Sequence, residues 1–390
     1  MKARTLLVAC LAHVMHDGLT DLLYVMLPIW RNEFGLSLAT VGLLRSLYSG
    51  AMATFQVPSS IIAERVGART ILVIGTALAA LCYAITATRS TYVAIAVALF
   101  AGGIGASVQH PISSNLIAQA YEGARSRAAL GTYNFSGDVG KMAIPALVAA
   151  LLIVMPWRSV LLIVACIGLC VAAAILIFGP RARVVVEHDD AQPNGAATGR
   201  TFTRGFALLL AIGAIDSATR TGFLTFLPFV ITGKGTPVQT VGFALTLIFA
   251  GGAAGKFICG FLGDRIGVLA TVCITEGLTA LGILAILPLN LGATLAVLPL
   301  IGVALNGTSS VLYGSVPELV APRQRQRAFG IFYTVGIGSG AISPVLSGAL
   351  SDAHGVPTLM AAVAALVLFT IPLAVGLQMS QTARRGGVSG

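Results

Sequence analysis

The chain has 390 residues, of which 56% are hydrophobic and only 10% are charged, and its formal net charge is +10. An average soluble domain carries about 25% charged residues. The composition therefore excludes a soluble multidomain protein, and it also excludes a disordered chain or a disulfide scaffold. A membrane protein with several spans remains.

Twelve apolar stretches are long enough to cross a bilayer, because a hydrocarbon core of about 30 Å needs roughly 20 helical residues. Their continuous apolar runs favour helices over a barrel. The first stretch is not a cleaved signal peptide, since Asp17 and Asp21 interrupt it. The predicted spans are 5–30, 38–62, 70–88, 92–118, 127–153, 157–179, 204–231, 238–262, 268–288, 292–320, 327–350 and 356–378.

The basic residues predict how these spans are oriented. Sixteen of the 24 lie at the N-terminus, in even-numbered loops or in the C-terminal tail, and four lie in odd-numbered loops. The positive-inside rule then places both termini in the cytoplasm. We expect the protein to lie in the inner (plasma) membrane. No basic patch lies on a soluble domain, so we expect no nucleic-acid partner. The six cysteines lie in or beside spans without CxxC spacing, and we expect neither a metal nor a cofactor.

The chain repeats itself with an offset close to 200 residues. The predicted domains are a six-helix bundle at 1–179, a polar cytoplasmic linker at 180–203, and a second bundle with a short tail at 204–390. Two parallel, pseudo-symmetric bundles are typical of a rocking transporter with its site near the midplane, whereas a channel or a membrane enzyme needs no such symmetry. The matched pairs include Leu27-Pro28 with Leu227-Pro228, Thr40-Val41-Gly42 with Thr240-Val241-Gly242, and Ile144-Pro145 with Ser343-Pro344.

A charged loop motif follows the second span of each half. Gly67 and Gly267 permit tight turns there. The motifs resemble the loop signature of the major facilitator superfamily, although Ser60 and Glu64 replace the usual Gly and Asp in the first copy. The resemblance implies an all-α fold of twelve transmembrane helices and a gate that closes the cytoplasmic side, and a solvated topogenic turn is the alternative. The motif residues are Glu64, Arg65, Gly67, Arg69, Gly260, Asp264, Arg265 and Gly267.

A narrower likeness is to fosmidomycin-resistance-type efflux proteins, which implies export. The matching segments are His13 with His16-Asp17, the run from Gly105 to Ser114, and the run from Gly137 to Pro145. The sequence departs from that branch at four places, which leaves the ligand chemistry open. Ile112 replaces a usually acidic residue, Asn115 a usually basic one, and Asp138 and Lys141 stand at usually uncharged positions.

Charged residues inside the spans are functional candidates, because each costs at least about 3 kcal/mol near the bilayer centre. His13, Asp17 and Asp21 share one helical face. Asp21 and Arg45 lie at similar depths, which predicts an ion pair. The pairs Asp138–Lys141 and Asp216–Arg220 have spacings that allow neutralisation within one helix, and both are either cavity groups or buried pairs that only stabilise packing.

These charges support two roles. Asp17 has no obvious partner and is the first candidate for proton coupling, followed by His13, His16 and Asp216. Arg45, Lys141 and Arg220 can hold an anion, and protonating a competing carboxylate would release them for it. Lys256 is expected to snorkel, and Glu276, in a peripheral span, receives no role. Further expected contacts to the substrate come from Asp21, Tyr24, Gln109, His110, Asp138, Asn306, Ser310 and Tyr313.

The sequence thus predicts a monomeric, proton-coupled secondary transporter of a small anionic or zwitterionic metabolite or drug. Its expected partners are that solute, protons and the lipid bilayer, and export is favoured. A proton-coupled importer of a small organic acid and a non-transporting sensor with the same fold stay open. The glycine-rich runs lack a preceding strand and a Walker lysine, so nucleotide binding is not expected. No nucleophile–base–acid set points to an enzyme.

Overall fold

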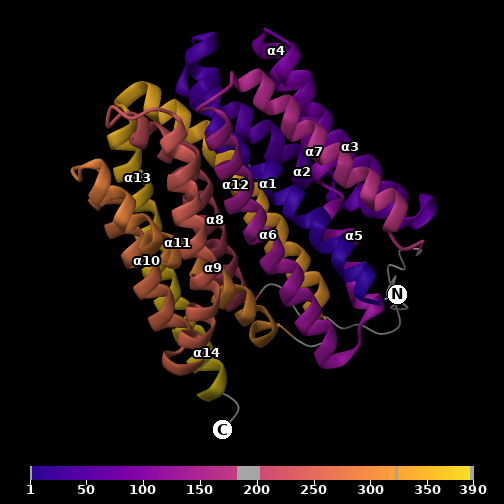
Figure 1. Cartoon of the computed structure of the whole chain (residues 1–390). Helices are drawn as coiled ribbons and strands as arrows, with labels where there is room; N and C mark the ends of the chain where they lie inside the picture. The colour runs from indigo at the N-terminus through magenta and orange to yellow at the C-terminus, as the bar shows by residue number, and fades with distance from the viewer. Residues whose placement is uncertain (1, 182–202, 321–323, 387–390) are drawn as a thin grey trace.

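The computed structural model describes residues 2–181, 203–320 and 324–386, and the secondary structure of this part of the chain is helix joined by short turns (Figure 1). Ten spans are long and apolar enough to cross a membrane. The helices α2 and α6 are not among these ten. The helices are α1 (Lys2–Phe34), α2 (Leu38–Val66), α3 (Ala68–Thr88), α4 (Tyr92–Ala106), α5 (Gln109–Ala120), α6 (Gly123–Leu151), α7 (Trp157–Phe178), α8 (Arg204–Thr232), α9 (Gln239–Ile266), α10 (Val268–Ala285), α11 (Leu291–Leu319), α12 (Arg325–His354), α13 (Val356–Leu368) and α14 (Thr370–Gly386).

Two of the twelve predicted spans each consist of two helices. The fourth span divides into α4 and α5 around Ser107 and Val108, and the last divides into α13 and α14 at Phe369. Each break precedes a proline by three residues, Pro111 and Pro372. A proline has no N–H to continue the helical hydrogen bonds and crowds the preceding turn, so the helix is interrupted there.

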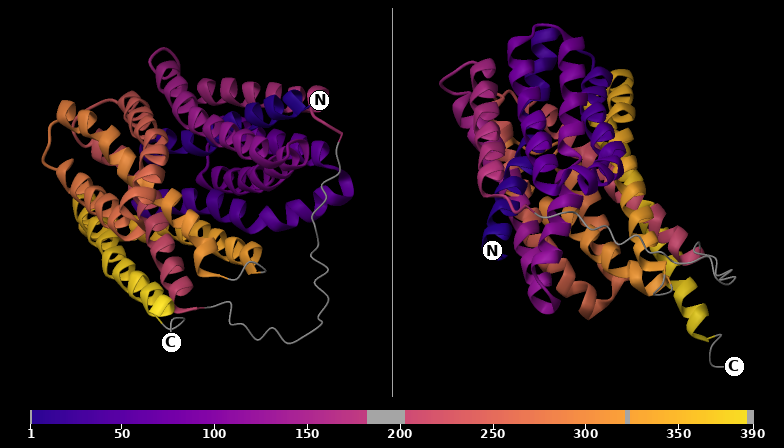
Figure 2. Two further views of the ribbon diagram at one scale, coloured as in Figure 1. Left: turned by 90° about the horizontal axis from the view of Figure 1, so that it is seen from below. Right: turned by 90° about the vertical axis from the view of Figure 1, so that its right-hand side faces the viewer.

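The helices form two bundles, α1–α7 and α8–α14, which Figure 2 shows as separate groups of ribbons. The backbone retains the sequence repeat. Gly35 and Gly235 have φ of 61° and 77°, and Gly67 and Gly267 have φ of 100° and 83°, a conformation that glycine adopts without strain. The predicted linker boundaries stay a prediction, because 182–202 lie outside the described residues.

The bundles meet along two seams, where α2 packs on α12 and α6 packs on α9. In each seam, a glycine of one half packs closely against the backbone of a proline in the other half. A Cβ atom on Gly42 would lie 2.0 Å from the Pro344 carbonyl oxygen, and one on Gly242 would lie 2.7 Å from that of Pro145. Gly42 and Gly242 are repeat partners, as are Pro145 and Pro344, so the seams are two copies of one contact.

Polar contacts reinforce both seams at the end of the molecule away from the termini. The carboxylate of Asp352 on α12 accepts hydrogen bonds of 2.8 Å from the backbone N–H groups of Leu38 and Ala39, where α2 begins. In the other seam the Gln239 amide donates to the Leu152 carbonyl at 3.0 Å. The halves are therefore held together on the side opposite the termini.

Candidate functional site

Asp17 is the centre of a buried polar cluster in the N-terminal half. The Nε2 atoms of His13, His16 and His110 lie 3.5, 3.7 and 3.9 Å from its Oδ1 atom. Lys141 Nζ lies 3.4 Å from Oδ2. The expectation that Asp17 has no partner is therefore wrong, because α5 and α6 bring residues to it that are remote in the sequence.

The local structure fixes the histidines. His13 Nδ1 lies 2.7 Å from the Tyr133 carbonyl oxygen, and the two rings stack at 4.1 Å. His110 is in the first turn of α5, so the break after α4 sets where its ring lies. Gly137 brings α6 close, since a Cβ there would lie 2.5 Å from Asp17 Oδ2.

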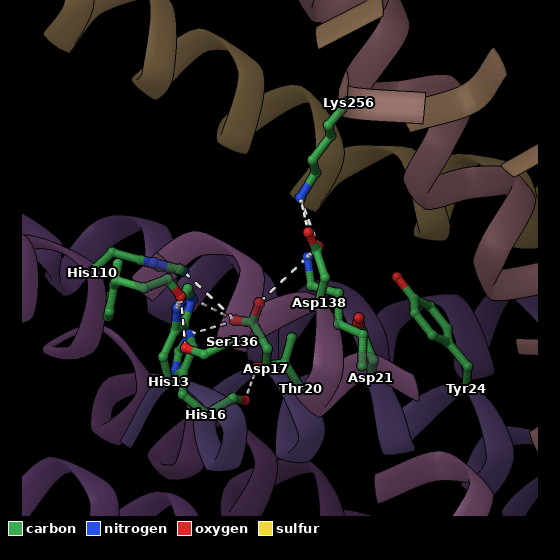
Figure 3. A network of polar contacts seen from close by, with 12 residues as sticks. His13, His16, Asp17, Thr20, Asp21, Tyr24, His110, Ser136, Asp138 and Lys256 are labelled. Atoms are coloured by element: carbon green, nitrogen blue, oxygen red, sulfur yellow. Dashed lines mark hydrogen bonds and ion pairs between the residues drawn. The ribbon is translucent and has the colours of Figure 1, made fainter. Parts of the chain in front are cut away.

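An ion pair joins the two halves beside this cluster. Lys256 on α9 reaches Asp138 on α6, and its Nζ atom lies 2.6 and 2.7 Å from the two carboxylate oxygens (Figure 3). The predicted partner of Asp138, Lys141, is farther away at 4.0 Å. The prediction that Lys256 snorkels toward the membrane surface is wrong, because a buried carboxylate in the facing half attracts it.

The predicted Asp21–Arg45 pair is present, with a distance of 3.8 Å. Arg45 also donates to the Tyr24 hydroxyl at 2.9 Å and to the Thr20 carbonyl at 3.4 Å, and it lies over the Tyr24 ring. All three side chains are buried. In this conformation the guanidinium is committed to partners within its own half.

The C-terminal half holds a smaller set of charges. Asp216 and Arg220 on α8 are 3.5 Å apart, and Arg220 also donates to Ser309 on α11 at 3.3 Å. Glu276 on α10 is only 1% exposed, within electrostatic reach of both charges. Its helix, α10, packs mainly against α11, α13 and α14 of its own half, and the view of this span as peripheral stays a prediction.

The cations are more exposed than the carboxylates that they neutralise. Lys141, Arg220 and Lys256 have side-chain exposures of 30%, 25% and 37%, whereas Asp17, Asp138 and Asp216 are at most 9% exposed. Lys141 and Arg220, from opposite halves, are close enough to repel one another. An anion placed among these three cations would relieve that repulsion.

The other predicted substrate contacts have separate environments. Gln109 is buried beside His110, and Ser310 is half-buried. Asn306 donates to the Gly302 carbonyl of its own helix at 3.3 Å. Tyr313 packs against the rings of Phe329 and Tyr333. The sequence analysis gave no central role to Lys256, although a lone lysine in an otherwise apolar span was a signal for one.

The loop motifs lie at the end of the bundles that carries the termini. Gly67 and Gly267 end α2 and α9 and donate to the Ala63 and Gly263 carbonyls. Within the described part of the chain, Glu64, Arg65 and Asp264 form no ion pair, and Arg265 lies over the Phe261 ring. Arg69 donates to the Leu176 carbonyl. The gating role stays a prediction, and these charges are free for partners in another conformation.

Twelve spans in two repeated bundles, with charges from both bundles at their meeting point, define a secondary transporter of small solutes. The family model described as Major Facilitator Superfamily matches residues 9–229 and 209–387. The chain belongs to the major facilitator superfamily, a family of transporters rather than enzymes, and it is a multi-pass membrane protein.

Relatives of this chain are distant. It is 23% identical to the "Probable L-galactonate transporter" of Escherichia coli (strain K12), over 83% of this chain and 77% of that protein. It is 25% identical to the "Multidrug resistance protein MdtL" of Shewanella oneidensis, over 57% and 56% of the two chains.

Solved structures share the fold. A bacterial homologue of the human lysosomal transporter Spinster, in an inward-facing and unoccupied conformation, matches with a TM-score of 0.82 and 16% identity, covering 98% of both chains. The nucleoside transporter NupG matches with a TM-score of 0.76 and 15% identity, covering 97% of this chain and 99% of that one.

Proposed function

We propose that this chain is a proton-coupled transporter that moves a small organic anion together with a proton. Under an inward proton gradient this coupling favours uptake over the export predicted from the sequence. The observation that carries the proposal is the arrangement of Lys141, Arg220 and Lys256. These cations come from both halves and are partly exposed, while their carboxylate partners lie buried behind them. Lysine and arginine side chains in this arrangement suit a carboxylate or phosphate group.

Asp216 is the residue that we propose to couple the proton to this anion. The charged groups facing it are Arg220 on its own helix and Glu276 on α10. A proton on Asp216 removes the competitor for Arg220, whose guanidinium then binds the anion. Loss of the proton restores the 3.5 Å pair and expels the anion. Asp216 thus couples the movement of the proton to the movement of the anion, because both compete for or release Arg220.

The two halves support alternating access. With both termini in the cytoplasm, as the basic residues predict, the seams close the outer side and the observed conformation faces inward. The Asp138–Lys256 pair crosses between the halves. An anion that draws Lys256 away from Asp138 would loosen this link and favour the opposite conformation.

One relative supports an anionic solute. The names of the relatives leave import and export as the two possible directions of transport. The name of the Escherichia coli relative points to a sugar acid, which an importer of organic acids would also accept. The name of the Shewanella oneidensis relative points to efflux, as does the likeness to fosmidomycin-resistance-type proteins. A sensor with this fold would bind such a solute without moving it.

The test uses the full chain in proteoliposomes with and without a pH gradient. L-galactonate is the first solute, followed by other small carboxylates and by phosphonate antibiotics. We expect the gradient to drive uphill movement of at least one anion. Asp216→Asn should abolish uphill movement and retain counterflow exchange, because Arg220 stays free of its competitor.

Glu33→Gln is the matched control. It also removes one carboxylate, but from a solvent-exposed pair with Arg158 at the far end of α1. Its uphill transport should equal that of the unmodified protein. An Asp216→Asn variant that still responds normally to the gradient would exclude this residue as the coupling group. Saturable binding without flux would identify a sensor instead.

A further inference from the structure

We propose that His13, His110 and Asp17 form a binding site for a divalent late first-row transition metal ion, such as Zn²⁺, with His16 beside it as a fourth donor. The donor atoms of the first three lie within 4.8 Å of one another. They come from α1 and α5 of the N-terminal half, on the opposite side of Asp17 from Asp138 and Lys256 (Figure 3).

The spacing of the donors suits such an ion. A tetrahedral site with bonds of about 2.0–2.1 Å has ligand-to-ligand edges of roughly 3.3 Å. The Nε2 atoms of His13, His16 and His110 lie 3.5, 3.7 and 3.9 Å from one carboxylate oxygen. The donor atoms, which lie within 4.8 Å of one another, would draw together by up to about 1.5 Å to complete the coordination. Two imidazoles and a carboxylate form a donor set that zinc commonly adopts.

His13 provides the independent sign of a missing ligand. A carbonyl oxygen only accepts hydrogen bonds, so the contact with Tyr133 fixes the proton of a neutral His13 on Nδ1. Its Nε2 atom is left with a lone pair, buried and without a hydrogen-bond partner, 3.5 Å from a carboxylate oxygen. Two acceptors facing each other need a cation between them. Metal-binding histidines characteristically donate their second N–H to a carbonyl in this way.

A metal ion satisfies this arrangement better than a proton does. A proton bridges two atoms at hydrogen-bond distance, whereas the N–O distances here are 3.5–3.9 Å. One metal ion can bind all the converging atoms together. The inference replaces the proton role predicted for Asp17, and the proposed coupling through Asp216 does not depend on it.

The surroundings allow the ion to enter and to be neutralised. The His110 side chain is 43% exposed, whereas those of His13 and Asp17 are at most 9% exposed, so His110 is the accessible edge of the site. Lys141 contacts the other carboxylate oxygen, Oδ2. Oδ1 is therefore left to the histidines. Because the metal ion and Lys141 together bring excess positive charge, the ion should bind more strongly when an anion occupies the neighbouring site.

The experiment titrates Zn²⁺ into the full-length protein, purified in detergent through a tag without histidines, and measures binding by calorimetry. We expect one ion per chain. His13→Gln and His110→Gln should each raise the Kd at least about tenfold. His354→Gln is the control, because His354 is exposed at the end of α12, and its Kd should stay within twofold.

X-ray absorption of the zinc-loaded unmodified protein tests the site without relying on a variant that folds. Imidazole scattering and a nitrogen or oxygen shell at about 2.0–2.1 Å are expected. A folded protein that binds no zinc, or a shell without imidazole, would overturn the inference. So would an unchanged Kd in both histidine variants. None of these measurements requires transport, so the proposed function can fail or hold separately.

Discussion

The two halves of the molecule share a backbone and differ in how they hold charge. In the N-terminal half, Asp17 and Asp21 are enclosed by histidines and by Arg45. In the C-terminal half, Arg220 and Lys256 project partly exposed cations toward the first half. The two halves therefore share the glycines and prolines that set helix contacts. Their polar side chains differ, with enclosed carboxylates in the N-terminal half and partly exposed cations in the C-terminal half.

Removal of Lys256 should have the largest effect, since it is the charge that links the unlike halves. Lys256→Met leaves Asp138 with Lys141 at 4.0 Å as its nearest cation. We expect the rate of solute transport to fall at least about 100-fold, because the carboxylate, neutralised only by the more distant Lys141, repels an incoming anion. Lys256→Arg should retain most of the rate, and a methionine variant within twofold of normal would contradict the cross-half link.

The shared backbone predicts equal effects at repeat partners. Gly42→Ala and Gly242→Ala each force a methyl group into a seam. Overpacking of this kind costs about 1–3 kcal/mol, so both variants should unfold at lower temperature in detergent, by similar amounts. Gly50→Ala, also on α2, is the control because no atom lies within 4 Å of the added group. A large difference between the two seam variants would show that the repeat does not extend to packing.

The two seams differ in their polar contacts. Removing these contacts should therefore change the population of the separated state by different amounts, and by less than the glycine substitutions change stability. Asp352→Ala removes two hydrogen bonds to the start of α2, whereas Gln239→Ala removes one. Loss of a helix cap of about 1 kcal/mol corresponds to a roughly fivefold population shift. Spin labels at Asn32 and Thr358 should report a larger share of the separated state in the Asp352 variant. A stronger effect of Gln239→Ala would reverse this ranking.

The loop motifs should affect stability least. Arg65→Ala and Asp264→Asn change exposed side chains that form no ion pair in this conformation, so the free energy of unfolding should change by at most about 0.5 kcal/mol. Transport should nevertheless slow, because the predicted gate would use these charges when the other side opens. Loss of stability without any loss of rate would favour a structural turn over a gate.

The sequence was sufficient for the fold because hydrophobic length and the 200-residue repeat are local signals. It also predicted the Asp21–Arg45 pair, since depth along two adjacent spans is easily counted. The breaks before Pro111 and Pro372 were missed, although proline spacing carries that information. A hydropathy window averages over about 20 residues, so it does not reveal a break of one or two residues within a span.

The central contacts were less predictable because they join helices from opposite halves or distant spans. Lys256 was assigned to the membrane surface from its position in α9, and only the packing of α9 on α6 shows its partner Asp138. The three histidines around Asp17 likewise depend on how α5 meets α1. Spacing within one helix reveals a shared face, but it does not reveal which facing helix supplies the partner.

The duplicated glycine–proline seams have a mechanical consequence. A rigid body that touches another at two fixed points retains one rotation, about the line through those points. Gly42 on Pro344 and Gly242 on Pro145 are two such points, and both are backbone contacts that no rotamer change can relax. While both contacts hold, they confine the bundles to a hinge-like swing whose displacement grows with distance from that line and is largest near the termini.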